Sequence, residues 1–237
     1  MKEKSKEENF ILVTFWSLIV IGLTKWLRPQ TIPFDFLHFW EINGSIFEAV
    51  KNSWILFAWG TGITAIVAFT TRNNPFHNRE AEKRLLYGAL ISAWAGVAEE
   101  ICFRWLIFYG LIVSLKIGNF LVFGWLGFGV ASWIYPNIIV PFANFITLDY
   151  LQPILFNGYG WAVGAAIITA NGKFRDGHAY QGLFGWINSW FGGMFFFYLM
   201  FNYGIQSAII VHFLYDLFIF IVYYVDSVIE RSLGWSR

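Results

Sequence analysis

Long apolar runs, each close to the length of a membrane-spanning helix, recur along the chain. A helix needs about 20 apolar residues to cross the hydrocarbon core of a bilayer. The runs cover residues 10–23, 54–70, 85–97 with its continuation 105–115, 120–140, 154–170, 183–201 and 204–225. This pattern predicts an all-α, polytopic helical membrane protein with about six to eight transmembrane helices in one bundle.

The composition supports a membrane protein rather than a soluble domain. Of the 237 residues, 57% are hydrophobic and only 13% are charged, whereas soluble domains have about 25% charged residues. The 13 Trp and 11 Tyr residues fit aromatic belts at two membrane interfaces, so membrane lipid is an expected partner. A net charge of +1 gives no reason to expect a nucleic acid partner. The single cysteine, Cys102, excludes an intramolecular disulfide.

Basic residues gather before the first apolar run and in the loop between the second and the third. They are Lys2, Lys4, Lys6, Arg72, Arg79, Lys83 and Arg84. Because basic loops stay on the cytoplasmic side, we expect an integral, multi-pass membrane protein with a cytoplasmic N-terminus. Residues 1–83 are predicted to form a helical pair with a cytoplasmic loop, and residues 84–228 the membrane core, within one integral membrane domain.

Three charged side chains interrupt the third apolar run, in the stretch AEEICFRW. An Asp or Arg at the centre of a membrane helix costs about 2.5–3.5 kcal/mol, so such residues generally face the bundle interior and pair. Glu100 and Arg104 are four residues apart and share a helix stripe, which predicts an ion pair. Glu99 points about 140° away from Arg104 and is left for another use. The plainer interpretation is a buried ion-pair cluster that only fixes helix packing.

Two further polar clusters lie in or beside apolar runs downstream. The stretch KFRDGH holds Phe174 and His178, and the preceding Asn171 and Gly172 predict a helix break. The stretch VHFLYD places His212 and Asp216 four residues apart in the last long run.

Glu99, His178 and His212 therefore form a small set of ionisable groups on separate helices. Such a set is typical of a general-base or metal site held away from bulk water. The plainer alternatives are an interfacial histidine bonded to a backbone carbonyl at His178, and a mutually satisfied pair of His212 with Asp216.

These three stretches together resemble the motifs of one family of intramembrane proteases. EEICFR is similar to the Glu-Glu-x-x-x-Arg motif of the CPBP family, also called ABI, which includes CAAX prenyl endopeptidases. FRDGH matches its Phe-x-x-x-His motif and HFLYD its His-x-x-x-Asn/Asp motif. All three occur in the order found in the family, across residues 99–216.

The resemblance implies a role for each matched residue. Glu99 would activate a water molecule and His178 would help to hold it. His212 and Asp216 would stabilise the oxyanion that forms at the scissile carbonyl. The implied substrate is a peptide or a lipidated peptide at the membrane, and no cofactor is expected.

The sequence departs from the family pattern at two points. Trp105 stands where the family usually has glycine after the arginine of the motif. The interval between Arg104 and His178 is also longer than is usual in the family. Both differences bear on helix packing and on topology, and neither removes a matched catalytic residue.

Other functions fit the same ionisable residues. A zinc-dependent protease would use Glu99, His178 and His212 as ligands and keep an open position for water. A proton-coupled transporter uses intramembrane Glu, His and Asp as a relay. A third alternative is an immunity protein that sequesters a peptide without cleaving it.

Overall fold

In the computed structural model, helices are the only regular secondary structure of the described residues, which are 6–71, 81–147, 149, 152–155 and 158–232. The predicted all-α class is therefore confirmed for this part of the chain. Contacts between residues divide the chain into two compact units, each made of two segments. Unit 1 comprises Met1–His38 and Ile101–Phe174, and unit 2 comprises Phe39–Glu100 and Arg175–Arg237.

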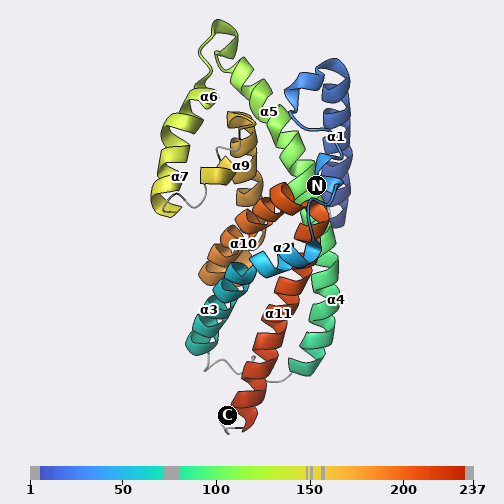
Figure 1. The fold of residues 1–237 in the computed structure, drawn as a ribbon, viewed down its shortest axis with the longest axis vertical. Helices are drawn as coiled ribbons and strands as arrows, with labels where there is room; N and C mark the ends of the chain where they lie inside the picture. The colour runs from blue at the N-terminus through green and yellow to red at the C-terminus, as the bar shows by residue number, and fades with distance from the viewer. Residues whose placement is uncertain (1–5, 72–80, 148, 150–151, 156–157, 233–237) are drawn as a thin grey trace, which may run out of the picture. The chain divides into compact units, whose positions relative to one another are not determined.

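Unit 1 contains α-helices together with short 3₁₀ and π-helical segments. They are α1 (Lys6–Leu27), η1 (Pro29–Thr31), the π-helical η3 (Glu100–Ile107), α5 (Phe108–Leu121), η4 (Gly124–Leu126), α6 (Val130–Ile134), the π-helical η5 (Tyr135–Ile139), α7 (Val140–Thr147), α8 (Gln152–Leu155) and α9 (Trp161–Gly177). Helix η3 begins at the last residue of unit 2, and α9 ends three residues inside unit 2. Helices α1 and α5 pack side by side (Figure 1).

Unit 2 is built around the last helix of the chain. Its elements are η2 (His38–Trp40), α2 (Ile46–Asn52), α3 (Trp54–Thr71), α4 (Ala81–Glu99), η6 (Ala179–Gln181), α10 (Gly182–Tyr203) and α11 (Ile205–Ser232). Helix α11 packs against α2, α3, α4 and α10, and it lies alongside α4 (Figure 1). Gly204 joins α10 to α11 with a φ of +88°, a conformation that glycine adopts readily at the end of a helix.

Within the residues that the structure describes, two helical stretches are long and apolar enough to cross a membrane. Tyr87–Leu121 runs from α4 through η3 to the end of α5, and Ile205–Ile229 covers most of α11. Thr14–Leu27 and Trp54–Val67 are shorter apolar helices. Length and composition alone give weak support for membrane association, so the predicted six to eight spans stay a prediction.

The predicted orientation and domain boundary rest largely on residues outside the described part of the chain. Residues 1–5 and 72–80 are not described, which covers Lys2, Lys4, Arg72 and Arg79. The cytoplasmic N-terminus and the division at residue 83 stay predictions.

The prediction that residues 120–140 form one continuous membrane-spanning helix is wrong. Helix α5 ends at Leu121, and the chain reverses through η4 before α6 begins at Val130 (Figure 1). Gly127 has a φ of +84°, which glycine adopts without the steric penalty that other residues meet. The reversal thus uses glycines that lie inside an otherwise apolar sequence.

The predicted helix break at Asn171 and Gly172 is also wrong. Helix α9 runs unbroken from Trp161 to Gly177. Asn171 is buried, and a glycine inside a helix lowers its stability by only about 1 kcal/mol, which packing can offset.

A stripe of small residues brings α4 close to α11. Gly88, Ser92 and Gly96 recur every four residues on α4 and are buried. A side chain on Gly96 would meet the backbone of α11, because an added Cβ would lie 3.1 Å from the carbonyl oxygen of Ile209. Small residues at this spacing let two membrane helices approach closely. The next residue at the same spacing is Glu100.

Trp105, the departure from the family pattern, has a packing role in unit 1. Its indole Nε1 donates a hydrogen bond of 2.8 Å to the carbonyl oxygen of Phe36. The two rings lie 4.5 Å apart. Trp105 therefore holds the segment after η1 onto the π-helical turn.

Candidate active site in unit 2

The predicted ionisable residues from three separate stretches of sequence meet inside unit 2. Glu99 ends α4, Glu100 follows it, His178 lies just past α9, and α11 carries His212 and Asp216. These residues are far apart in the sequence: Glu99 and His178 are separated by 79 positions, and Glu100 and His212 by 112.

The shortest contact joins Glu100 to His212. The Nδ1 atom of His212 lies 2.7 Å from the Oε1 atom of Glu100. Both side chains are buried, with 4% and 0% of their surface exposed. In the tautomer that carries its proton on Nδ1, the imidazole donates this bond to the Glu100 carboxylate. This bond fixes the orientation of the imidazole and directs Nε2 away from Glu100.

Glu99 lies between the two imidazoles. Its Oε1 is 3.8 Å from Nε2 of His178, and its Oε2 is 3.8 Å from Nε2 of His212. Nε2 of His212 is also 3.6 Å from Oδ2 of Asp216. These separations exceed a direct hydrogen bond of about 2.7–3.2 Å, and polar groups at such distances commonly act together through a shared water molecule.

The exposure of the side chains changes across the cluster. Glu99 and Asp216 expose 28% and 29% of their side-chain surface, whereas Glu100 is fully buried. The cluster therefore has an accessible side, formed by Glu99 and Asp216, and a buried side, formed by Glu100 and His212.

A turn held by an ion pair places His178. Arg175 binds Asp176 through Nε and Nη2 at 2.8 and 2.7 Å. The Arg175 guanidinium also lies over the ring of Trp186 on α10, 4.1 Å from its centre, a cation–π contact worth about 0.5–1 kcal/mol at an exposed position. His178 lies two residues after Asp176, and its backbone N–H donates to the Arg175 carbonyl oxygen at 2.9 Å.

No protein-family model, curated protein or solved structure matches the chain.

Two groups in unit 2 support the site and escaped the sequence analysis. The ring of Phe196 on α10 stacks on His212, with centres 4.3 Å apart and planes at 19°. The amide oxygen of Asn188 accepts hydrogen bonds from the hydroxyl of Tyr215 at 2.6 Å and from Nε1 of Trp59 at 3.1 Å. Asn188 thereby ties α3, α10 and α11 together next to Asp216.

The sequence carries a signal for one of these groups. Asn188 is a lone strongly polar side chain in the middle of an uncharged apolar run, and buried polar groups in such runs are generally hydrogen-bonded. Phe196 stands within a row of phenylalanines, and nothing in that row distinguishes it from its neighbours.

The remaining two predicted residues, Arg104 and Phe174, contact one another in unit 1. The Arg104 guanidinium lies over the Phe174 ring, 4.1 Å from its centre. Both side chains are buried. The Phe103 ring packs edge-on against Phe174, with centres 5.4 Å apart. The predicted Glu100–Arg104 pair joins residues of different units and stays a prediction.

The π-helical geometry of η3 changes the basis of that prediction. Glu100–Ile107 forms i to i+5 hydrogen bonds in place of the i to i+4 bonds of an α-helix. The angles expected for an α-helix therefore do not apply between Glu100 and Arg104. Single π-helical turns inside longer helices occur frequently at functional sites.

The metal alternative receives no support from the side chains that the structure describes. Among them, no group of three or more His, Cys, Asp or Glu residues is arranged to hold a metal ion. Zinc coordination by Glu99, His178 and His212 stays an alternative that only a measurement can decide.

Proposed function

We propose that the chain is an intramembrane endopeptidase that hydrolyses peptide bonds of membrane-associated substrates with a water molecule activated by Glu99. The observation that supports this function is the meeting of Glu99, His178, His212 and Asp216 within one unit. These are the residues that the resemblance to the CPBP family assigns to catalysis.

Glu99 is the carboxylate best suited to be the base. Its side chain is partly exposed and lies near the Nε2 atoms of both imidazoles. Glu100 is fully buried and already bonded to His212. A general base must reach the proton that it removes, directly or through one water molecule, and Glu99 meets this condition better than Glu100.

Glu100 then has a positioning role. It accepts the Nδ1 proton of His212 and leaves Nε2 facing Glu99 and Asp216. With a proton on Nε2 as well, the imidazole donates toward the site. There it can stabilise the negative charge that develops on the carbonyl oxygen.

The proposed reaction follows from these positions. Glu99 takes a proton from water while the water oxygen bonds to the carbonyl carbon of the scissile peptide. His178 holds the water, and His212 with Asp216 stabilises the resulting oxyanion. Glu99 returns the proton to the departing amine as the carbon–nitrogen bond breaks.

The proposed protease is an integral, multi-pass membrane protein with a cytoplasmic N-terminus. The two span-length helices and the basic residues around the first two apolar runs support it. A substrate for such a site is a peptide or a lipidated peptide that itself lies in or on the membrane.

The test compares peptides released from membranes that carry the wild-type protein or the Glu99→Gln variant. Glutamine keeps the size of the side chain and removes the base. General-base catalysis contributes about 10²–10⁴-fold to a rate, so peptides that depend on the protein should almost disappear. Quantitative mass spectrometry of peptides and new N-termini measures the result.

Glu48→Gln is the matched control, because Glu48 lies on the first turn of α2 and is exposed. It should leave the released peptides unchanged. His178→Ala should resemble Glu99→Gln. Cleavage that continues in both site variants, with the protein folded in the membrane, contradicts the proposal.

A chelator separates the two versions of the protease. Metal-free glutamate catalysis predicts that cleavage by purified protein survives dialysis against EDTA. A zinc enzyme predicts stoichiometric metal in the purified protein and loss of cleavage on dialysis, followed by recovery when zinc is returned.

A further inference from the structure

We infer that the reversal between α5 and α6, residues 122–129, inserts its aromatic side chains into the bilayer at the boundary between headgroups and acyl chains. This segment belongs to unit 1, and the inference does not depend on the proposed protease activity. The acyl chains of lipids would cover this surface.

The surface of the reversal is apolar and aromatic. Phe123, Trp125, Leu126 and Phe128 are all exposed, and Phe128 exposes 73% of its surface. No residue between Lys116 and Asp149 is charged. Exposed apolar patches of this kind usually mark a contact with a protein or a membrane.

Four backbone N–H groups of the reversal, those of Val122, Leu126, Gly127 and Phe128, donate to carbonyl oxygens within the reversal or at the end of α5. The N–H of Phe128 donates to the carbonyl oxygen of Phe123 at 3.2 Å, and the N–H of Gly127 donates to that of Gly124 at 3.0 Å. The N–H of Val122 donates back into α5, to Gly118 at 2.9 Å. A turn in water can leave such groups to solvent, whereas a turn next to hydrocarbon must satisfy them internally.

Polar side chains around the reversal are also used internally. The amide oxygen of Asn119 accepts the backbone N–H of Ser132 at 3.0 Å. The Ser132 hydroxyl donates to the Gly129 carbonyl oxygen, and the Asn137 amide donates to the Trp133 carbonyl oxygen, both at 2.8 Å. These bonds turn polar atoms toward the backbone and leave apolar atoms on the outside.

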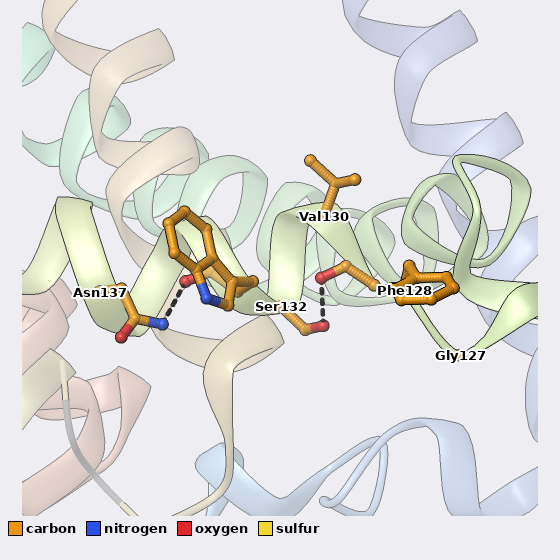
Figure 2. Close-up of a pocket in the computed structure, with 7 residues that line it drawn as sticks. Gly127, Phe128, Val130, Ser132 and Asn137 are labelled. Atoms are coloured by element: carbon orange, nitrogen blue, oxygen red, sulfur yellow. Dashed lines mark hydrogen bonds between the residues drawn. The ribbon is translucent and has the colours of Figure 1, made fainter.

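An open hollow of about 500 Å³ lies along the reversal, α6 and the π-helical η5 (Figure 2). It is lined by Gly127, Phe128, Gly129, Val130, Ser132, Trp133 and Asn137. Figure 2 shows the hydrogen bonds of Ser132 and Asn137 as dashed lines among the residues that line the hollow. A mostly apolar hollow in which Ser132 and Asn137 donate to backbone carbonyl oxygens suits a hydrocarbon chain better than a polar ligand.

Its position along the chain favours lipid over a second copy of the protein. The reversal directly follows Tyr87–Leu121, the longer of the two span-length helices. Tryptophan is enriched where a membrane helix meets the interface, and Trp125 and Trp133 are both exposed here. Membrane helices associate through small residues, whereas this surface presents large aromatic ones.

The experiment uses the fact that the chain has one cysteine. In a Cys102→Ala background, Phe128→Cys and, separately, Trp125→Cys are labelled with the fluorophore NBD. The full-length protein is placed in vesicles of phosphatidylcholine and phosphatidylglycerol. Some of these vesicles contain phosphatidylcholine with a nitroxide near the headgroup end of its acyl chain. Lys173→Cys, at an exposed position near the end of α9 in the same unit, is the reference.

The inference predicts that both labels on the reversal lose fluorescence to nitroxide lipid and are protected from aqueous iodide. The label at residue 173 should show the reverse. Quenching of residues 125 and 128 by iodide as strong as that of residue 173 overturns the inference. Self-quenching that rises with protein density, with no loss to nitroxide lipid, also overturns it and indicates a second copy as the partner.

Circular dichroism of each labelled variant checks that its helix content matches the wild-type protein. The two reversal positions serve as independent reporters, because Phe128 lines the hollow and Trp125 does not. Agreement between them is required for the inference to stand.

Discussion

The α4–α11 pair of unit 2 and the α5–α6 reversal of unit 1 place their polar groups in opposite ways. In the pair, carboxylates and imidazoles from distant stretches of sequence face one another. In the reversal, polar groups bond to the backbone within a few residues, and apolar side chains cover the outside. The first arrangement leaves carboxylates and imidazoles facing one another, and the second turns several polar side chains toward the backbone beneath an apolar surface. This difference agrees with the chemistry proposed for unit 2 and the lipid contact proposed for unit 1.

The largest effect is expected from removing the buried partner of His212. Glu100→Leu should lower the free energy of unfolding by about 3 kcal/mol, because a buried hydrogen-bonded group loses its partner. Glu100→Gln keeps an oxygen that can accept the Nδ1 proton and should lose about 1 kcal/mol. Thermal unfolding in detergent micelles measures both. Equal losses for the two variants would show that the hydrogen bond is not what holds this side of the cluster.

The next effect tests the reversal. Phe128→Arg places a charge where acyl chains are expected, at an energetic cost of up to about 2.5–3.5 kcal/mol at full membrane depth. The segment should therefore move toward the headgroups. In the Trp125→Cys background, the NBD label should become more accessible to iodide. Phe128→Leu, which keeps the side chain apolar, should leave the label where it was.

A smaller loss is expected from filling the gap between α4 and α11. Gly96→Leu forces a side chain against the backbone at Ile209 and Phe213 and should lower stability by about 1–3 kcal/mol. Gly62→Leu is the control, because an added Cβ at Gly62 on α3 has no atom within 4 Å. Comparable unfolding temperatures for the two variants would mean that close approach of α4 and α11 is not required.

The smallest effect concerns an exposed ion pair in unit 1. Nζ of Lys25 lies 2.7 Å from Oδ1 of Asp35, and this hydrogen bond lowers the pKa of Asp35 below its ordinary value of 3.8. Because the pKa of Asp35 is lower in the folded protein than in the unfolded chain, its ionised form stabilises the fold at any pH above the unfolded pKa. This stabilisation is lost as the pH falls through the pKa of the folded state. The difference in unfolding temperature between wild-type protein and Asp35→Asn should be small at pH 7 and vanish in acid. Salt should reduce it as well.

The sequence predicted the parts of the molecule that depend on local patterns. Apolar runs located α1, α3, α10 and α11. A helix that is apolar on every face appears in the sequence as an unbroken apolar run, so it can be recognised without knowing its neighbours. The ionisable residues of the cluster were found because charge is rare in such runs. Their meeting in unit 2 agrees with the expectation that buried charges have partners.

Other features depend on contacts that no local pattern records. The bond of Glu100 to His212 joins residues 112 positions apart, and sequence spacing relates Glu100 only to residues near it along the chain. The reversal after α5 did have a local signal, since glycines stand at positions 124, 127 and 129. The surrounding hydrophobicity concealed it, because the same apolar residues fit either a span or a turn beside lipid.

The regular spacing of Gly88, Ser92 and Gly96 leaves the alignment of α4 along α11 undetermined on its own. Residues four apart on a helix are about 6 Å apart along its axis, so sliding α4 by one step would again set a small residue against α11. Glu100 interrupts this repetition, because only one alignment brings its carboxylate to Nδ1 of His212. A single polar bond can select one register among several apolar alternatives. Glu100 therefore fixes the register of α4 on α11. The same bond that orients the imidazole also determines the position of the neighbouring Glu99 along α11.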